Sequence, residues 1–506
     1  MTRARRNTLV IFGLYAVLAF ALNAANRYQI NRDGIRYLEL ARHVSEGRIF
    51  ESVDMRRAPL IIWLLAPLVR LPFFREEPLF AARLVMGFSG ILALAAAKVF
   101  IRRFRLSGGL EFAALSCLAA LLAHRSSLLI TPDAFLAAGL LLYFYYVTDD
   151  GLIEKPRTAF AAGLAAGAAY LSKHFAFPFF LVHFPLAVFL RSRDRSGAAS
   201  LRALALGLAG FFLLASPGLA LLRWKLGYWT FGGFEKRDMV APPYWVSPLD
   251  EHWSPLDNPA AFLWQAAVCL RGLLFFSVSA FGFGGIVLVA SFFALALLFF
   301  RKEAGIFYKT LFAAAAVYVA GYCGIYCYEE RYFWPVMILL YFLACQGLEK
   351  LGGKLSWKVR FALAGLLFFP LVVRPIENLA MTWPAIFQPR KNPYREMAGM
   401  LSGMSGHAAA VTCWRWHAHN AVYIGFYRGK PFETIPYCPS PDHLVSELEA
   451  RNAPDFVVFS GSHDQPGTRL SEKLKNDPRF FVRATLPPVD GWTGKVEVFE
   501  LHKGGG

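Results

Sequence analysis

"MTRARRNTLVIFGLYAVLAFALNAA", residues 1–25, sets three arginines ahead of an apolar run long enough to cross a bilayer, and this stretch decides the class of fold. A basic start, an apolar run and small residues behind it also resemble a secretory signal peptide. We interpret the segment as a retained first helix, because many more apolar runs follow it. The sequence therefore predicts an integral membrane protein.

The composition agrees with lipid as the solvent. Hydrophobic residues make up 56% of the 506 residues and the mean hydropathy is +0.41, whereas soluble proteins are roughly 45–50% apolar. A net charge of +18 would suit nucleic acid. The Lys and Arg residues lie mainly in short clusters between apolar runs, however, which is typical of membrane helices that meet anionic head groups. We expect membrane lipids as partners and no nucleic acid.

Eleven segments are apolar enough, or nearly so, to span a membrane, which takes about 20 residues. They are residues 8–26, 82–101, 110–125, 134–148, 158–173, 175–190, 203–223, 277–300, 308–327, 332–348 and 359–374. The expected fold is a polytopic α-helical membrane protein with about eleven transmembrane helices.

Charge sets the expected orientation. Every second connection is short and carries at least two Lys or Arg residues: "KVFIRRFR", "DDGLIEKPR", "RSRDRSG", "RKEAGIFYK" and "EKLGGKLSWKVR". Basic connections stay in the cytoplasm, so the N-terminus is expected there as well. An odd number of spans then places the C-terminus outside. This predicts a multi-pass protein of the inner (plasma) membrane.

Two connections on the other face are long, residues 27–81 and 224–276. In the first, apolar residues recur near helical spacing and predict an amphipathic helix at the interface; they are Ile35, Leu38, Leu40, Val44 and Ile49. The second combines Trp, Tyr, Gly and Pro. A loop of this length is commonly a lid or a binding element.

The composition changes after residue 375, so we divide the chain into a transmembrane domain, 1–375, and an extracytoplasmic domain, 376–506. Strands are expected at "AAAVTCW", "NAVYIGFY", "DFVVFSG", "FFVRATL" and "KVEVFEL", and helices at "PDHLVSELEARN" and "TRLSEKLKND". This pattern predicts a small α/β domain. Cys413 and Cys438 share it and could form a disulfide or stay free.

Two clusters follow the first span. In "NRDGIRYLELARHVSEG", Asp33 and Arg36 recur at helical spacing. A carboxylate there can act as a general base, with the Arg tuning its pKa, or it can simply cap an interfacial helix. In "MRRAPLIIW", Arg56 and Arg57 offer planar hydrogen-bond donors that suit phosphate. The same pair is equally typical of ordinary positive charge beside a membrane span.

Three more clusters are expected on the same face. Asp133 opens the fourth span in "TPDAF", where it is a helix cap or a functional carboxylate. Lys173 and His174 stand between the fifth and sixth spans, able to hold a phosphate or to snorkel. The last cluster gathers Glu330, Arg331 and Tyr332 in "YEERYFWP". The convergence of five clusters on one face favours function over structure.

The order of these elements resembles the GT-C superfamily of glycosyltransferases, in particular the branch of the aminoarabinose transferases and protein O-mannosyltransferases. The carrying motifs are "DGIRYLELARHVSEG", "RRAPLIIW", "TPD", "LSKH" and "RYFWP", spread over almost the whole chain. The chain departs from the family pattern at three positions. Gly34 stands where an acidic residue usually follows the first Asp, and Ala58 separates the basic residue Arg57 from Pro59. His174 stands where a Gly usually follows the Lys.

The resemblance implies roles for these residues. Asp33 would be the catalytic base and Asp133 the second acidic residue of the site. The substrate-binding residues would be Arg36, Tyr37, Arg56, Arg57, Lys173, His174, Glu330, Arg331 and Tyr332, with Arg57 on the donor phosphate. The implied reaction is an inverting transfer of a sugar from a polyprenyl-phosphate donor to lipid A, an envelope glycan or a protein.

Outside the resemblance, two other classes stay in view. A transporter or flippase should carry ionisable groups near midspan and repeated halves, and an assembly protein would work through its C-terminal domain. The histidines show no metal-ligand spacing beyond "HAH" at His417 and His419. We expect no cofactor and a metal-independent reaction, with a divalent metal left open.

Overall fold

A computed structural model describes most of the chain. The described residues are 2–26, 30–192, 195–232, 267, 284–301, 305–323, 330–352, 354, 356–387, 393–404, 408–412, 415–430, 432–436, 440–453, 455–461, 465–486 and 494–501. Most of the expected loop 224–276 therefore lies outside them, as do Cys413 and Cys438.

The chain divides into two compact units. One comprises residues 1–29 and 36–386, and the other comprises residues 30–35 and 387–506. The change in composition at residue 375 had suggested an earlier boundary. The last helix of the first unit continues to Phe387, so the helical part extends about three turns further.

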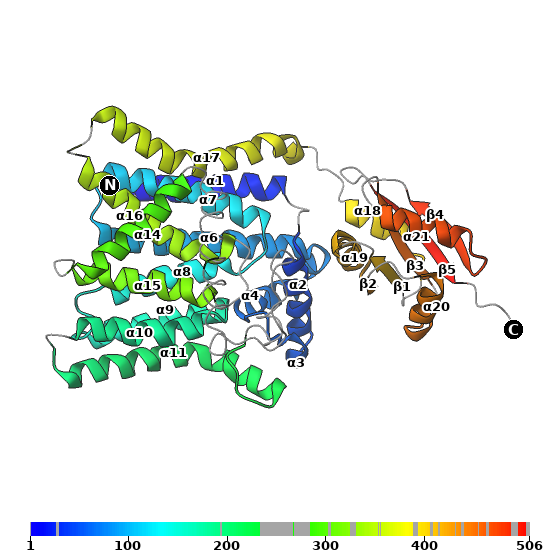
Figure 1. Cartoon of the computed structure of the whole chain (residues 1–506), viewed down its shortest axis with the longest axis horizontal. Helices are drawn as coiled ribbons and strands as arrows, with labels where there is room; N and C mark the ends of the chain where they lie inside the picture. The colour runs from blue at the N-terminus through cyan, green and yellow to red at the C-terminus, as the bar shows by residue number, and fades with distance from the viewer. Residues whose placement is uncertain are drawn as a thin grey trace. The chain divides into compact units, whose positions relative to one another are not determined.

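Among the described residues, eleven helices form the bundle of the first unit and overlap the eleven expected spans, of which residues 277–283 and 324–327 lie outside the described ranges. They are α1 (Arg3–Ala25), α6 (Pro78–Ile101), α7 (Gly108–Leu128), α8 (Asp133–Val147), α9 (Pro156–Ser172), α10 (Ala176–Arg191), α11 (Gly197–Leu226), α14 (Gly284–Phe300), α15 (Ile306–Cys323), α16 (Trp334–Leu351) and α17 (Trp357–Phe387). Helices α1, α6, α11, α16 and α17 are each long and apolar enough to cross a membrane alone. Figure 1 shows the bundle helices running side by side. The fold is that of a polytopic α-helical membrane protein.

Short helices occupy the connection between α1 and α6. They are α2 (Arg32–Ser45), α3 (Ile49–Ser52), α4 (Leu60–Val69) and α5 (Pro72–Glu76), and Figure 1 shows α2 to α4 at one end of the bundle. Helix α2 is the expected amphipathic helix: Ile35, Leu38 and Leu40 are buried, while Arg36 is exposed. Helix α4 is an apolar helix too short to be recognised as a span.

The closest helix packing joins α9 to α11 and depends on glycine. A Cβ atom at Gly163 would lie 1.9 Å from the carbonyl oxygen of Gly207, and one at Gly210 would lie 2.3 Å from the carbonyl oxygen of Phe160. No side chain fits at either place. The two backbones touch directly, as helices do in lipid where small residues line their interface.

The second unit is a five-stranded mixed sheet in the order β2-β1-β3-β5-β4. Strands β1 (Ala408–Thr412), β2 (Glu433–Pro436) and β3 (Asp455–Gly461) are parallel, while β5 (Gly494–Leu501) runs antiparallel to β3 and to β4 (Phe480–Leu486). Helices α18 (Pro393–Met400), α19 (Arg415–Arg428), α20 (Pro441–Ala450) and α21 (Gln465–Lys475) complete it. The expected small α/β domain is confirmed.

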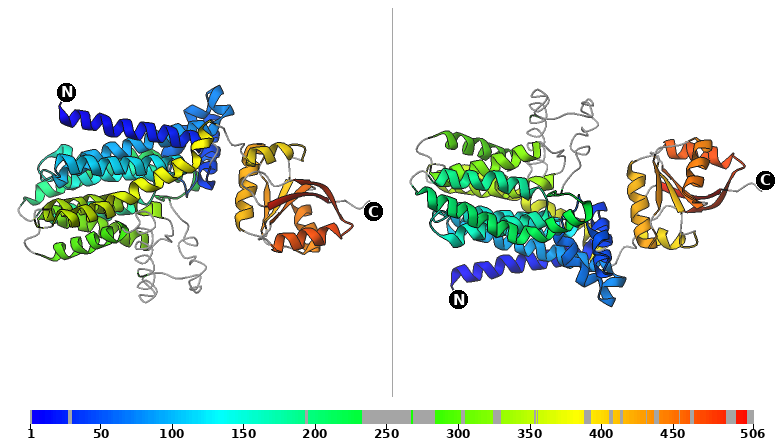
Figure 2. Two further views of the ribbon diagram at one scale, coloured as in Figure 1. Left: turned by 90° about the horizontal axis from the view of Figure 1, so that it is seen from above. Right: turned by 90° about the horizontal axis from the view of Figure 1, so that it is seen from below.

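Helices cover both faces of this sheet, as Figure 2 shows. Ala408 and Ala410 of β1 pack with α18 and α19, whereas Ala409 and Val411 pack with α20 and α21. The alternation follows from the period of two along a strand.

One strand prediction in this unit is wrong. "NAVYIGFY", residues 420–427, is the second half of α19, with Ala421 and Ile424 buried on one helical face. A short apolar run fits a strand or a helix equally well. The polar residues "RWHAH" before it extend it to 14 residues, which favours a helix. Strand β2, only four residues long, was not predicted.

Candidate functional site

A buried ion cluster lies where α8 begins. The Asp133 carboxylate is 1% exposed; the Lys173 ammonium is 2.7 Å from its Oδ1, and Nε of Arg331 is 3.6 Å from its Oδ2. The Lys173 ammonium also lies 3.7 Å from the ring centroid of Tyr332. Three residues far apart in the sequence thus form one cluster with a surplus of one positive charge.

Three separate elements position this cluster. Asp133 is the first residue of α8, where the positive end of the helix dipole favours a carboxylate. Lys173 ends α9 in an extended conformation. Arg331 and Tyr332 belong to the short helix η2 (Glu330–Phe333), and the hydroxyl of Tyr318 donates a 2.6 Å hydrogen bond to the Tyr332 carbonyl oxygen. The charges therefore lie at helix ends and not at midspan.

A tight turn presents the two arginines of "MRRAP". The carboxylate of Asp54 accepts a 2.8 Å hydrogen bond from the backbone N–H of Arg56, and its carbonyl oxygen accepts one of 3.2 Å from that of Arg57. Its other carboxylate oxygen lies 3.3 Å from Nε of Arg36. Arg56 is exposed, and the half-buried guanidinium of Arg57 stands 6.0 Å from the Tyr37 ring centroid. Asp54 was missed from the sequence, although an Asp two residues before the arginines is an Asx-turn signal.

A small pocket opens beside this turn. Its polar side is formed by Asp54, Arg57 and His174. Its apolar sides come from α4 and the end of α11, and they are lined by Pro59, Ile62, Trp63, Gly218, Leu221 and Leu222. A charged rim against an apolar wall suits a ligand with an anionic head and a hydrocarbon tail.

His174 joins the turn to the ion cluster. Its Nδ1 donates a 3.0 Å hydrogen bond to the Met55 carbonyl oxygen, and it follows Lys173 directly. Burial lowers the pKa of His174 to about 4, so the ring is neutral near pH 7. The chain after α11 passes close over the ring, because a Cβ atom at Gly232 would lie 2.4 Å from its Nδ1. Only glycine fits there, and its φ of +79° favours glycine as well.

The remaining predicted residues lie on the elements named above. Asp33 occupies the first turn of α2, one turn before Arg36. Glu330 begins η2, and its side chain is outside the described residues. The structure therefore brings Asp133, Lys173, Arg331 and Tyr332 into one cluster, and Arg57 and His174 to one pocket.

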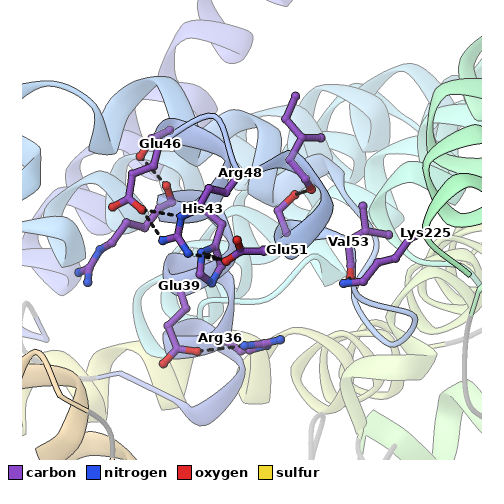
Figure 3. A network of polar contacts seen from close by, with 12 residues as sticks. Arg36, Glu39, His43, Glu46, Arg48, Glu51, Val53 and Lys225 are labelled. Carbon is purple, nitrogen blue, oxygen red and sulfur yellow. Dashed lines mark hydrogen bonds and ion pairs between the residues drawn. The ribbon is translucent and has the colours of Figure 1, made fainter. Parts of the chain in front are cut away.

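The exposed face of α2 and α3 carries a separate ionic network, shown in Figure 3. Arg48 pairs with Glu46 and Glu51, His43 Nδ1 is 3.3 Å from Glu51, and Arg36 pairs with Glu39. Exposed pairs of this kind are weak, because water screens both charges. The His43–Glu51 pair links α2 to α3. Apart from Arg36, which also pairs with Asp54, the residues of this network do not contact the pocket.

Across the described ranges, no three His, Cys, Asp or Glu side chains gather as a metal-binding group. The side chains of His417 and His419 are outside those ranges.

No protein-family model and no curated protein sequence matches the chain. Solved structures do. ArnT from Cupriavidus metallidurans bound to undecaprenyl phosphate superposes with a TM-score of 0.59 at 14% identity, covering 97% of both chains. An Archaeoglobus fulgidus oligosaccharyltransferase in complex with Zn and sulfate gives a TM-score of 0.55 at 13% identity, covering 87% of this chain and 67% of that one. The chain has the fold these proteins share, the GT-C fold, as the resemblance predicted.

Proposed function

We propose that this protein is a membrane glycosyltransferase that takes its sugar from a polyprenyl-phosphate donor. The observation that carries the proposal is the pocket beside Arg57, with that guanidinium and the neutral His174 ring at its rim and an apolar wall from α4 and α11. The donor phosphate would meet the rim while the isoprenoid chain lies along the wall. The likeness in fold to ArnT, solved with undecaprenyl phosphate, supports the same ligand class.

Two sets of cations serve the phosphate in this proposal. Arg57 binds the donor, because a guanidinium offers paired donors to phosphate oxygens. Asp133 orients Lys173 and Arg331, and these two cations stabilise the negative charge that develops on the leaving phosphate. Charges that are already oriented stabilise a transition state without the cost of reorganisation.

The reaction is a single displacement. The acceptor hydroxyl oxygen attacks the anomeric carbon, and the bond from that carbon to the phosphate oxygen breaks. Polyprenyl phosphate leaves with the electron pair, and the configuration inverts. Asp33 takes the hydroxyl proton as general base. This assignment rests on the sequence pattern around α2.

The reaction takes place on the extracytoplasmic face of the inner membrane. The parity of the basic connections supports this orientation, because they all belong to the bundle end opposite Asp133. In this orientation the C-terminal α/β unit is extracytoplasmic as well. The acceptor is a lipid such as lipid A, an envelope glycan or a protein.

The decisive experiment measures sugar transfer by the full-length protein in nanodiscs. A panel of labelled polyprenyl-phosphate sugars is tested with envelope lipids, glycans and peptides as acceptors. We expect Asp33→Asn to lower kcat by a factor of at least 100, since general bases contribute about 10²–10⁴. Glu39→Gln, on the same helix and partly exposed, is the matched control and should retain activity. Undiminished transfer by Asp33→Asn would remove the base, and a wild type inactive with every donor would remove the function.

Donor binding is tested separately. Binding of undecaprenyl phosphate should weaken at least tenfold in Arg57→Ala, because one lost charge-assisted phosphate contact costs about 1.5–3 kcal/mol. The adjacent and exposed Arg56→Ala should change it less. Equal losses in the two variants would show a general charge effect and not a site.

A further inference from the structure

A second pair of cations lies at the bundle end opposite Asp133. It comprises Arg103, in the short helix η1 (Arg102–Phe104), and Arg191, the last residue of α10. Asp149, just after α8, lies between them. No part of the proposed glycosyl transfer uses this end of the molecule.

Arg191 is buried and only half satisfied. Its side chain is 5% exposed, and Nη1 donates a 2.9 Å hydrogen bond to the Asp149 carbonyl oxygen and lies 3.5 Å from the carboxylate of Asp150. The other edge of the guanidinium, Nε and Nη2, has no hydrogen-bond partner among the described residues. A buried donor left unpaired is unfavourable, because it has lost its hydrogen bonds to water. That edge is the one that binds two oxygens of a planar or tetrahedral anion side by side.

Arg103 adds a second cation to the same place. Its Nη2 pairs with the Asp149 carboxylate, its guanidinium carbon lies 4.2 Å from the Tyr145 ring centroid, and its Nε is buried without a partner in the described chain. Asp149 thus serves both arginines, through its carboxylate and its carbonyl oxygen. The second carboxylate nearby, on Asp150, is 95% exposed and screened by water.

We propose that Arg191 and Arg103 form a binding site for a phosphate group, supplied by an anionic phospholipid of the leaflet at this end of the bundle. A phosphodiester provides the oxygens that the free guanidinium edge lacks, and it balances the second positive charge. A lipid is favoured over a free anion because Phe189, two residues before Arg191, is 67% exposed on the surface of α10, where an acyl chain would lie.

The surrounding charge favours the same ligand. Further basic residues lie in or beside the connections at this end, namely Arg102, Arg105, Lys155 and Arg157, whereas Arg195 is already paired with Glu154. Basic residues near an anionic membrane surface are attracted to its lipid head groups. They would concentrate anionic lipid around the site, whereas the buried edge of Arg191 supplies the specific contact.

The test compares lipids on the full-length protein by native mass spectrometry and thermal unfolding in detergent. Wild type should retain phosphatidylglycerol at least tenfold better than phosphatidylcholine and gain thermal stability from it. Arg191→Lys keeps the charge and a donor for the Asp149 carbonyl oxygen but loses the paired edge, so the preference should fall about tenfold. Arg195→Gln, an exposed partner of Glu154 at the same end, is the matched control and should keep the preference.

A separate arm adds inorganic phosphate without lipid. Protection by phosphate that Arg191→Lys abolishes, with equal retention of the two lipids, would assign the site to a soluble anion and overturn the lipid as its source. If Arg191→Lys does not fold, Arg103→Lys gives the same comparison. Wild-type lipid preference in both variants, or no response of wild type to either ligand, would overturn the site. The outcome is independent of glycosyl transfer, because no sugar donor is present.

Discussion

An aspartate between two cations occurs at both ends of the helical bundle, and the two arrangements differ in how deeply the aspartate is buried. At one end the carboxylate of Asp133 is fully buried, while Lys173 and Arg331 reach it from the sides. At the other end Arg191 is buried and the carboxylate of Asp149 is a quarter exposed. A buried acid aligns its cations for a ligand beside them. A buried, half-satisfied cation still needs an anion of its own.

The largest effect should come from removing the buried acid. Asp133→Asn leaves Lys173 and Arg331 facing each other without a carboxylate, and breaking a buried pair costs about 3–5 kcal/mol. We expect a lower unfolding temperature in nanodiscs and loss of measurable transfer. Asp150→Asn changes an exposed carboxylate at the opposite end of the bundle and should alter neither the unfolding temperature nor sugar transfer. An unaltered melting curve for Asp133→Asn would remove the distinction between the two ends.

The next largest effect should be a pH dependence of stability that comes from His174, which lies at the same end of the bundle as Asp133. With a pKa lowered by burial from 6.5 to about 4, folded His174 binds fewer protons than the unfolded chain between those values. Stability should therefore fall as the pH drops from about 6.5 to about 4, by up to about 3 kcal/mol. His174→Asn keeps a donor toward the Met55 carbonyl oxygen but does not titrate, so its melting temperature should fall less over this range. Parallel curves for the two proteins would contradict the assignment.

A smaller loss of stability is expected for the partly exposed Asp149. Asp149→Asn removes the ion pair with Arg103 but keeps an oxygen for the backbone N–H of Gly151, which lies 2.8 Å from Oδ1. Because the carboxylate is partly hydrated, the cost should be about 1–2 kcal/mol. Transfer activity should be unchanged. A loss of activity here, at constant melting temperature, would mean that the ends are coupled.

The smallest effect should come from the ring beside Lys173. Tyr332→Leu loses the cation–π contact, worth about 1 kcal/mol, and should lower kcat several-fold, whereas Tyr332→Phe keeps the ring and should behave as wild type. The Tyr318 hydrogen bond goes to a backbone oxygen and survives both changes. Equal activity in the two variants would show that the ring does not orient the ammonium.

Much of the fold could be predicted because each span has its own apolar run. Helix α4 was missed because ten residues are too few to be recognised as a span, and the second half of α19 was taken for a strand because a mostly apolar run of eight residues fits both structures. The site could be predicted only as separate clusters. Asp133 and Lys173 are 40 residues apart, and their contact depends on how α8 packs on α9. The turn at Asp54 is local and could have been found.

The glycine contact between α9 and α11 has a consequence for how this pocket could change in evolution. Lys173 ends one of the two helices, and Leu222 lies on the pocket wall near the end of the other. A single methyl group at Gly163 or Gly210 would push the two helices apart about 15 Å from Lys173 or about 18 Å from Leu222, at 1.5 Å per residue. It would widen the pocket without changing the identity of any residue that lines it. Substrate preference could thus drift through positions that no ligand ever touches.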